Sequence, residues 1–265
     1  MTAIALTIAG SDSGGGAGIQ ADLKTFSALG VYGASVITAL TAQNTLGVQG
    51  IHDVPADFVR LQMRSVFADL KVNTVKVGML SVPETILAVA RGLAEDYAGP
   101  VVLDPVMVAA SGDSLLTENA IATLTSALLP RAALLTPNLP EAARLLGGPV
   151  ARSEAEMLDQ ATRLLAFGPD AVLIKGGHGE GAEAVDLLVT PSMTLRLAAP
   201  RIPTANTHGT GCTLSSAIAA GLAKGLGIED AARAAKAYVH AAIAAADRLD
   251  IGAGHGPTHH FHAFW

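Results

Sequence analysis

The chain of 265 residues has a single cysteine, few aromatic side chains and few charges. Because one cysteine cannot form an internal disulfide, the sequence is not that of a disulfide-stapled secreted domain. Aromatic residues make up 4% and charged residues 15% of the chain, and 17 Lys and Arg are outnumbered by 23 Asp and Glu. The basic residues are scattered, whereas nucleic acids and anionic membranes require clustered cations. We therefore expect neither nucleic acid nor a membrane as a partner.

Two further absences concern location. The first Lys or Arg is Lys24, so the basic segment that opens a secretory signal peptide is missing. No uninterrupted apolar run approaches the ~18 residues that cross a membrane. We expect a cytoplasmic protein, and with half of its residues hydrophobic the chain has enough apolar surface for a large core.

Short apolar runs alternate with longer amphipathic stretches. The runs predict strands at Ile4–Ala9, Ser35–Leu40, Thr74–Val77, Pro100–Leu103, Ala132–Leu135 and Ala171–Ile174. The stretches predict helices at Ile19–Ala28, Ala56–Asp69, Pro83–Asp96, Glu118–Leu129 and Glu154–Phe167. Near-continuous apolar strands separated by helices are typical of a parallel sheet that is covered on both faces.

The pattern changes after Lys175. Two strand-like pieces, Glu183–Val189 and Met193–Ala198, follow each other without a helix between them, which indicates antiparallel strands at one edge. Two alanine-rich helices are expected last, at about Thr210–Lys224 and Ile228–Leu249. No linker divides the chain, so we predict one α/β domain of three layers over residues 1–265.

Clustered glycines follow the first predicted strand, in the segment Gly10–Gly18. Such a turn permits positive φ angles and lets a ligand approach the backbone closely. The dinucleotide fingerprint fails because Ile19 stands where its third glycine is required, and the P-loop fails because its lysine is missing. A tight structural turn and a substrate-binding turn both remain open, although Asp12 and Asp22 favour substrate binding.

A second small-residue turn, His208–Thr213, precedes a long apolar helix. Free N–H groups at the N-terminus of a helix form an anion site that suits a phosphate or a transferring phosphoryl group. The alternative is an ordinary helix start, capped by Thr210 or Thr213.

Together the two turns closely resemble those of ribokinase-like small-molecule kinases, and among these the hydroxymethylpyrimidine/phosphomethylpyrimidine kinases of thiamine biosynthesis. The resemblance continues along the chain, through Ala9–Asp12, Gly16–Thr25, Ala39–Thr45, Val75–Leu80, Leu103–Met107, Thr136–Ala142, Ile174–His178, Asn206–Thr213 and Gly254–Pro257. It implies the ribokinase-like three-layer fold, with a central mostly parallel sheet, helices on both faces and a few antiparallel edge strands. It also suggests a homodimer.

The activity that the resemblance implies is ATP-dependent, Mg²⁺-dependent phosphorylation of 4-amino-5-hydroxymethyl-2-methylpyrimidine and then of its monophosphate. A pyridoxal or pyridoxine kinase of the same superfamily is the alternative, because those substrates are also hydroxymethyl heteroaromatics. A catalytically silent binding protein is disfavoured, because such a protein would be expected to have lost Asn138, Glu141 or the anion-binding turn, and all three are present.

The resemblance also implies roles for individual residues. The pyrimidine is expected to contact Gly10, Asp22, Gln43, Met79 and Met107. The ATP phosphates are expected near Lys175 and Thr207, and Mg²⁺, through its waters, near Asp104, Asn138 and Glu141. The turn where the phosphoryl group transfers holds Gly209, Thr210, Gly211 and Cys212. The amide of Gln43 suits the aminopyrimidine edge because it offers both a donor and an acceptor.

Cys212 stands where most of the superfamily has an aspartate that serves as base. A helix N-terminus is expected to lower the pKa of this thiol. We also hypothesise that a neutral thiol tolerates both acceptors, whereas a fixed carboxylate would repel the anionic acceptor of the second step.

Other residues are given no catalytic role. The histidines near the end of the chain lack cysteine or carboxylate partners and are expected to pack or to lie in a tail rather than bind metal; they are His255, His259, His260 and His262. His208 is expected to bind phosphate or to stabilise its turn, and Phe261 and Trp265 to cover an apolar patch. The stretch Ala110–Ser114 is a candidate flap over the site.

Overall fold

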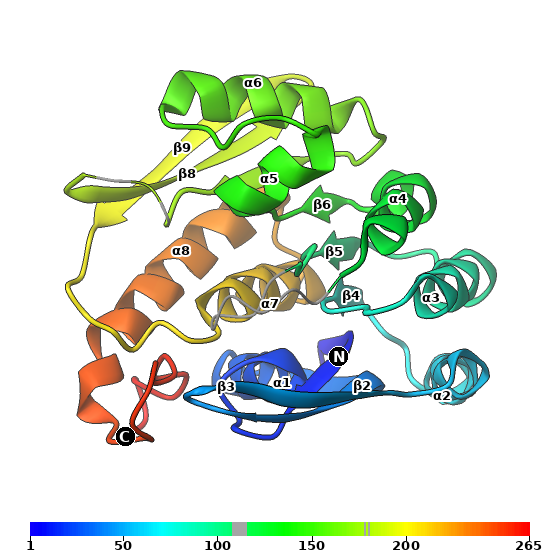
Figure 1. Cartoon of the computed structure of the whole chain (residues 1–265). Helices are drawn as coiled ribbons and strands as arrows, with labels where there is room; N and C mark the ends of the chain where they lie inside the picture. Colours follow the sequence, from blue (N-terminus) through cyan, green and yellow to red (C-terminus); the bar gives the residue numbers. More distant parts are fainter. Residues whose placement is uncertain (108–115, 178, 180) are drawn as a thin grey trace.

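The computed structural model describes residues 1–107, 116–177, 179 and 181–265, and these form three layers (Figure 1). Within them, nine strands make one sheet in the order β3-β2-β1-β4-β5-β6-β7-β8-β9. The strands are β1 Ile4–Asp12, β2 Tyr32–Asn44, β3 Gly47–Asp53, β4 Thr74–Val77, β5 Val101–Leu103, β6 Leu134–Leu135, β7 Val172–Lys175, β8 Glu183–Thr190 and β9 Met193–Pro200. The six strands from β2 to β7 in that order are parallel, and β3, β8 and β9 are antiparallel to their neighbours. The predicted fold class is confirmed.

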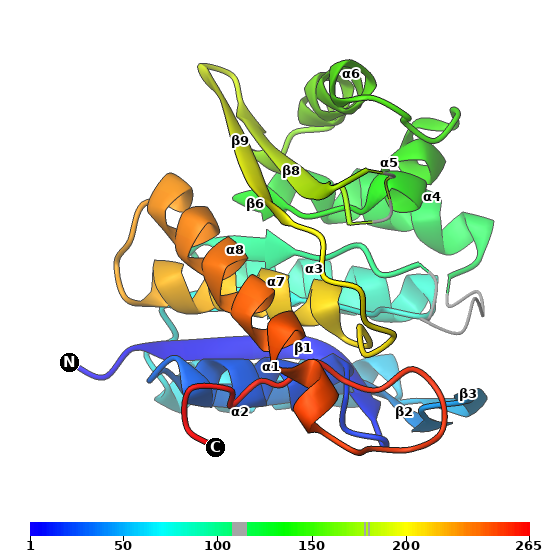
Figure 2. The ribbon, with the colours of Figure 1, turned by 90° about the vertical axis from the view of Figure 1, so that its left-hand side faces the viewer.

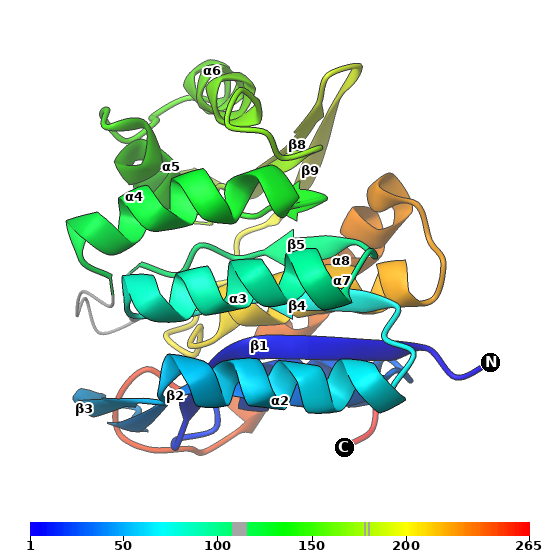
Figure 3. The same ribbon diagram turned by 90° about the vertical axis from the view of Figure 1, so that its right-hand side faces the viewer.

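The helices lie on both faces of the sheet. They are α1 Gly18–Ala28, α2 Ala56–Asp69, α3 Pro83–Asp96, α4 Glu118–Ala127, α5 Leu139–Leu146, α6 Glu154–Leu165, α7 Thr210–Ala223 and α8 Ile228–Ala244, with single 3₁₀ turns at Leu129–Arg131 and Ala246–Arg248. Figure 2 shows α1, α7 and α8 on one side of the sheet, and Figure 3 shows α2, α3 and α4 on the other. None of these helices, in the part of the chain that is described, is long and apolar enough to cross a membrane.

The core follows from the alternation of side chains along each strand. In β5, Val101 and Leu103 join the buried cluster beneath α2 to α6, while Val102 joins the one beneath α1, α7 and α8. Both faces of a central strand are thus apolar, which explains the continuous apolar runs of the sequence.

The main departure from the predicted elements is the hairpin β2–β3. Strand β2 runs to Asn44 rather than ending at Leu40, and β3 was not predicted. None of the seven residues of β3 is buried, so no apolar periodicity marks it. Strand β1 likewise continues to Asp12, with a register shift between Ala9 and Ser11.

The parallel strands deliver polar residues to one edge of the sheet. Asp12 ends β1, Asp104 follows β5, and Lys175 ends β7. The strand order reverses between β1 and β4, and in open α/β sheets ligands bind at such a reversal, beyond the carboxyl ends of the strands.

Candidate active site

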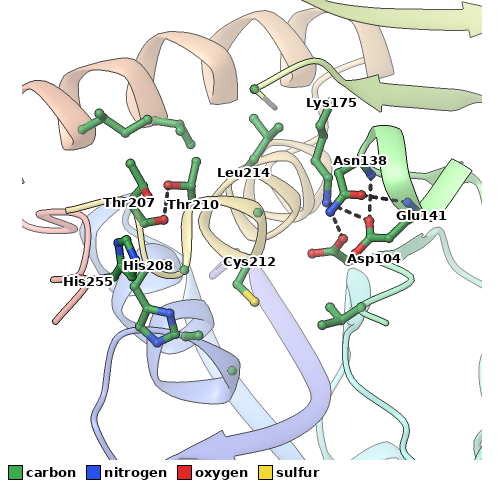
Figure 4. A pocket seen from close by; sticks show the side chains of 18 of the residues that line it. Asp104, Asn138, Glu141, Lys175, Thr207, His208, Thr210, Cys212, Leu214 and His255 are labelled. Carbon is green, nitrogen blue, oxygen red and sulfur yellow. Dashed lines mark hydrogen bonds and ion pairs between the residues drawn. The ribbon is translucent and has the colours of Figure 1, made fainter. Parts of the chain in front are cut away.

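A cavity of about 650 Å³ opens along the carboxyl edge of the sheet. All the residues predicted for the site line it except Asp22. Figure 4 shows the turn before α7, with His208 and Cys212, between Thr207 on one side and the cluster of Lys175 on the other. The Gly10–Gly18 turn and Gln43 meet this turn at His208. The volume is that of a site for small molecules.

Asp12 organises the glycine turn that follows β1. Its Oδ1 accepts a hydrogen bond from Gly14 N at 2.8 Å, and its Oδ2 accepts from Gly16 N at 3.1 Å and Ala17 N at 2.8 Å. His208 Nε2 lies 2.9 Å from the same Oδ2. Although burial raises the pKa of the Asp12 carboxyl, the hydrogen bonds from His208, Ala17 and Gly14 hold it below its usual value.

The two glycine turns are in direct contact with each other. A Cβ on Gly16 would lie 2.3 Å from His208 Cδ2, and a Cβ on Gly209 would lie 1.9 Å from the Gly16 carbonyl oxygen. Gly209 also has φ +78°, a conformation that L residues rarely adopt. His208 forms a backbone bridge to Pro257, so the end of the chain braces the same place. Glycine is therefore required where the turns meet.

The end of the cavity at Gln43 combines one amide with apolar walls. Gln43 Oε1 accepts a hydrogen bond from Thr41 Oγ1 at 3.2 Å, and Gln43 Nε2 lies 3.4 Å from His208 Nε2. Met79 and Met107 are buried and line the same cavity, and Met79 Sδ would lie 3.4 Å from a Cβ on Gly10. A few fixed polar groups among apolar walls are typical of a site for a flat heteroaromatic ring.

The helix α7 begins without a side-chain cap. Thr210 Oγ1 donates to the Thr207 carbonyl at 2.7 Å, and Thr213 Oγ1 donates to the Gly209 carbonyl at 2.8 Å. Since neither hydroxyl caps the N–H groups of the first turn, the capped-helix alternative is wrong. These N–H groups border the cavity and form the positive end of the helix dipole, an arrangement that attracts anions.

Lys175 joins two buried carboxylates on the other side of this turn (Figure 4). Its Nζ lies 2.7 Å from Asp104 Oδ1 and 3.7 Å from Glu141 Oε2. Asn138 and Glu141 form a reciprocal capping box at the start of α5, with bonds of 2.8 Å and 2.7 Å. Glu141 is buried, not an exposed helix residue, and burial raises its pKa to about 7 against the opposing charge of Lys175.

Asp22 departs from its predicted position. Its carboxylate is fully buried beneath the cavity and accepts hydrogen bonds from Thr7 Oγ1 at 2.6 Å and Ser216 Oγ at 2.7 Å. It pairs with Lys76, whose Nζ is 2.9 Å from both carboxylate oxygens. The position gives Asp22 no direct contact with a bound substrate, because its carboxylate is turned into the protein.

Lys76 is a residue that the sequence reasoning missed. It is fully buried and lines the cavity. A lysine within the four-residue buried strand β4 was the available signal, because burying a charge is costly unless it is paired. The end of the cavity at α8 was also missed, including Lys236, which pairs with Asp186 at 2.7 Å.

The expected effect of the helix N-terminus on Cys212 is not observed. Burial raises the pKa of its thiol to about 11, outweighing the nearby charge of Lys76. Cys212 is therefore a neutral thiol at neutral pH, and the expectation of a lowered pKa is corrected.

The remaining histidines are mostly structural. His260 is buried with its Nε2 3.1 Å from Thr213 Oγ1, while His255 lines the cavity. In the described part of the chain, no group of three or more His, Cys, Asp and Glu side chains is arranged to hold a metal. Trp265 is 64% exposed and packs against the rings of Phe261 and of the buried His259. The candidate flap at residues 110–114 lies outside the described residues.

Known proteins of similar sequence support the same interpretation of the site. A sequence model of the family described as phosphomethylpyrimidine kinase matches residues 12–259. The chain is 62% identical over 265 residues to the hydroxymethylpyrimidine/phosphomethylpyrimidine kinase of Rhizobium meliloti (strain 1021), covering 100% of this chain and 99% of that protein.

Two solved structures are also similar. The phosphomethylpyrimidine kinase from Clostridium difficile 630 has a TM-score of 0.80 and 44% identity, over 91% of this chain and 99% of that one. The pyridoxal kinase from Staphylococcus aureus, in complex with AMP-PCP and pyridoxal, has a TM-score of 0.91 and 31% identity, over 100% of this chain and 95% of that one.

Proposed function

The chain belongs to the phosphomethylpyrimidine kinase family, and from this premise we propose that it carries out two successive phosphoryl transfers in thiamine biosynthesis. The first moves the γ-phosphoryl group of ATP to the hydroxymethyl oxygen of 4-amino-5-hydroxymethyl-2-methylpyrimidine. The second moves another γ-phosphoryl group to the resulting monophosphate and gives the diphosphate.

The observation that carries this proposal is the continuity of the cavity. It joins a heteroaromatic pocket at Gln43, an uncapped helix N-terminus at Gly209–Cys212, and the charged cluster around Lys175. Phosphoryl transfer is catalysed almost entirely by positioning and by charge stabilisation, so these parts are sufficient.

The acceptor end selects the pyrimidine by hydrogen bonding and shape. An ionised Asp12 only accepts hydrogen bonds, so His208 Nε2–H donates to it and does not accept from Gln43. The Gln43 amide N–H groups are therefore free to donate to a ring nitrogen, while Thr41 Oγ1 lies 2.9 Å from the Ser11 carbonyl oxygen and 3.2 Å from Gln43 Oε1 and shares its one proton between them. In this proposal Met79 and Met107 contact the ring, and Gly10 allows it to approach the backbone.

The turn before α7 holds the transferring group. Backbone N–H groups of Gly209, Gly211 and Cys212 lie at the positive end of the helix dipole and donate to phosphoryl oxygens, whereas Thr210 N already donates to the Thr207 carbonyl at 3.2 Å. Gly211 lets Lys175 come close, because a Cβ there would lie 3.3 Å from Lys175 Nζ. Lys175 neutralises developing charge, and Thr207 contacts the ATP phosphates at the rim of the cavity.

In this proposal Cys212 does not act as a strong base toward the acceptor hydroxyl group. With a pKa raised to about 11, its thiol keeps its proton at neutral pH. The loose transition state of phosphoryl transfer develops little need for early deprotonation of the acceptor. Cys212 therefore contacts the acceptor group without adding a charge to the site.

The carboxylates beside Lys175 fit a magnesium ion that accompanies ATP. Asp104 and Glu141 share one ammonium group, and because the pKa of Glu141 is raised to about 7, a divalent cation nearby would favour its ionised form. Mg²⁺ takes few carboxylates and keeps several waters, and Asn138 supplies a further side-chain oxygen beside them. When bound, the ion neutralises charge on the ATP phosphates.

A homodimer is also part of the proposal. The β2–β3 hairpin at the sheet edge exposes Leu40, Leu46 and Ile51, with Leu46 70% exposed. Exposed apolar edge strands are typical association surfaces. Sedimentation velocity checks this point, and a monomer at micromolar concentration would refute it.

The two-step reaction is tested by following the products over time. Purified protein, ATP and Mg²⁺ are incubated with the hydroxymethylpyrimidine, and ³¹P NMR is expected to show the monophosphate first and the diphosphate later. Lys175→Met serves as the matched inactive control, because it removes the cation and keeps the shape of the side chain. Absence of both products with wild-type protein would overturn the proposal.

A further inference from the structure

Lys76 is a charge buried in the wall of the cavity. The side chain is fully buried, yet it is among the residues that line the cavity. A Cβ on Gly78 would lie 2.8 Å from Lys76 Nζ, so the backbone after β4 leaves space for the ammonium group. Burial lowers the pKa of this group, but the adjacent carboxylate of Asp22 raises it above its usual value, so the charge is kept at neutral pH.

The ion pair of Lys76 and Asp22 is oriented relative to the cavity. Lys76 lines the cavity and Asp22 does not, so the positive end of the pair faces the site. Asp22 is held from behind by Thr7 of β1 and Ser216 of α7, at 2.6 Å and 2.7 Å. The pair therefore cannot turn over without breaking buried hydrogen bonds, and its field is fixed relative to Cys212, four residues before Ser216 on α7.

The other lysines and arginines among the described residues that line the cavity all lie after β4 in the chain. Among the described residues from β1 to β4 that line the cavity, Lys76 is the only lysine or arginine. Lys175 is engaged by Asp104 and Glu141, and Lys236 by Asp186. The neutral thiol of Cys212 places no negative charge between Lys76 and the acceptor.

We propose that Lys76 is the positioning residue that makes the site accept an anionic phosphomonoester as well as a neutral alcohol. The inference rests on the two-step reaction proposed above. Lys76 acts through its charge across the cavity wall, where the low dielectric strengthens the interaction, and not by direct contact.

The chemistry of the second step leaves Lys76 unchanged. A bond forms between an oxygen of the acceptor phosphate and the γ-phosphorus of ATP, and the bond from that phosphorus to the β–γ bridging oxygen breaks. ADP leaves with the electron pair of the broken bond, and Lys76 keeps its protons. Bringing two phosphate groups together is unfavourable by repulsion, which a fixed positive charge on the acceptor side reduces.

The test compares two variants that differ only at Lys76. Asp22→Asn keeps the lysine, whereas Asp22→Asn with Lys76→Met removes both charges and leaves no unpaired ion. For each, kcat/KM is measured separately with the hydroxymethylpyrimidine and with its monophosphate, and thermal unfolding verifies the fold. Thr7→Val is the structural control, because it removes a hydrogen bond to Asp22 and no charge.

Relative to the wild-type protein, the double variant is expected to lose about 10-fold in the ratio of kcat/KM for the monophosphate to kcat/KM for the alcohol, because the charge that is removed from the cavity wall is the positive one, while Asp22 does not line the cavity. Thr7→Val, in which both charges remain, is expected to leave that ratio at the wild-type value. Equal losses with both acceptors in the double variant would overturn the inference while leaving the two-step function intact. A ratio lowered in Thr7→Val, in which both charges remain, would also overturn it, and this arm stands even if the double variant does not fold. A wild-type protein that is inactive on both acceptors refutes the proposed function itself.

Discussion

Replacing Asp12 by asparagine is expected to loosen the glycine turn and to destabilise the protein. The carboxylate has four hydrogen-bond partners, the N–H groups of Gly14, Gly16 and Ala17 and the ring of His208, at 2.8 to 3.1 Å. An asparagine has only one acceptor oxygen. If that oxygen takes the place of Oδ2, the amide NH₂ faces Gly14 N, and this N–H of an exposed residue loses its protein partner.

The magnitude follows from these bonds. Hydrogen bonds to a charged group are each about 1 kcal/mol stronger than neutral ones, whereas water can satisfy the N–H of the exposed Gly14. The three weakened bonds therefore give a predicted loss of about 3 kcal/mol in the free energy of unfolding. Because Gly16 is in van der Waals contact with His208, kcat/KM should fall as well.

Urea unfolding at neutral pH, followed by circular dichroism, measures this loss. Asp159→Asn is the matched control, since Asp159 is 66% exposed and pairs with Arg163 at 3.6 Å on the surface. Its effect is expected to be below about 0.5 kcal/mol. A loss at Asp12 no larger than that of the control would refute the role given to the carboxylate.

Three further changes test other parts of the account. Cys212→Asp puts a negative charge at the acceptor, so the rate of the second phosphorylation should fall more than that of the first; equal losses in separate assays would contradict this. Burial lowers the pKa of His260 to about 4 from 6.5, so the unfolded chain binds a proton that the folded chain refuses. Between about pH 7 and about pH 5, the free energy of unfolding of the wild-type protein should therefore fall by about 2 kcal/mol more than that of His260→Gln. Urea unfolding of both proteins at both pH values measures this difference. Gly209→Ala places a Cβ 1.9 Å from the Gly16 carbonyl oxygen and should lower Tm far more than Gly225→Ala, which has a similar φ of +86° and open space around it; similar shifts would refute the contact.

The fold was largely predictable because its strands are buried on both faces. Thr74–Val77, Ala56–Asp69 and Pro83–Asp96 were predicted with the bounds that the structure gives. The apolar runs mark such strands directly, and amphipathic periodicity marks the helices that cover them. The exposed strand Gly47–Asp53 was missed, because a strand without a buried face has no apolar pattern.

The residues that line the candidate site could largely be predicted from the sequence, but the orientation and the pKa of their charged groups could not. The resemblance named residues that are far apart in sequence, such as Gln43, Asp104 and Cys212, and the carboxyl edge of the sheet brings them together. The orientation of a side chain depends on tertiary packing and cannot be inferred from the sequence alone. Asp22 therefore proved to be a buried partner of Lys76, since three donors hold its carboxylate beneath the cavity.

The pKa of Cys212 could not be predicted from the sequence either. A helix N-terminus lowers the pKa of an exposed thiol, but burial has the opposite effect and is larger here. Only the packing of the site reveals which effect dominates. The revised value strengthens the hypothesis that a neutral thiol allows both acceptors.

The most direct test of the proposed function is a comparison of acceptors with ATP and Mg²⁺. Values of kcat/KM are measured for the hydroxymethylpyrimidine, for its monophosphate and for pyridoxine, using ADP release. The account predicts that both pyrimidines are turned over and that each exceeds pyridoxine. A higher value for pyridoxine, together with an inert pyrimidine monophosphate, would contradict it.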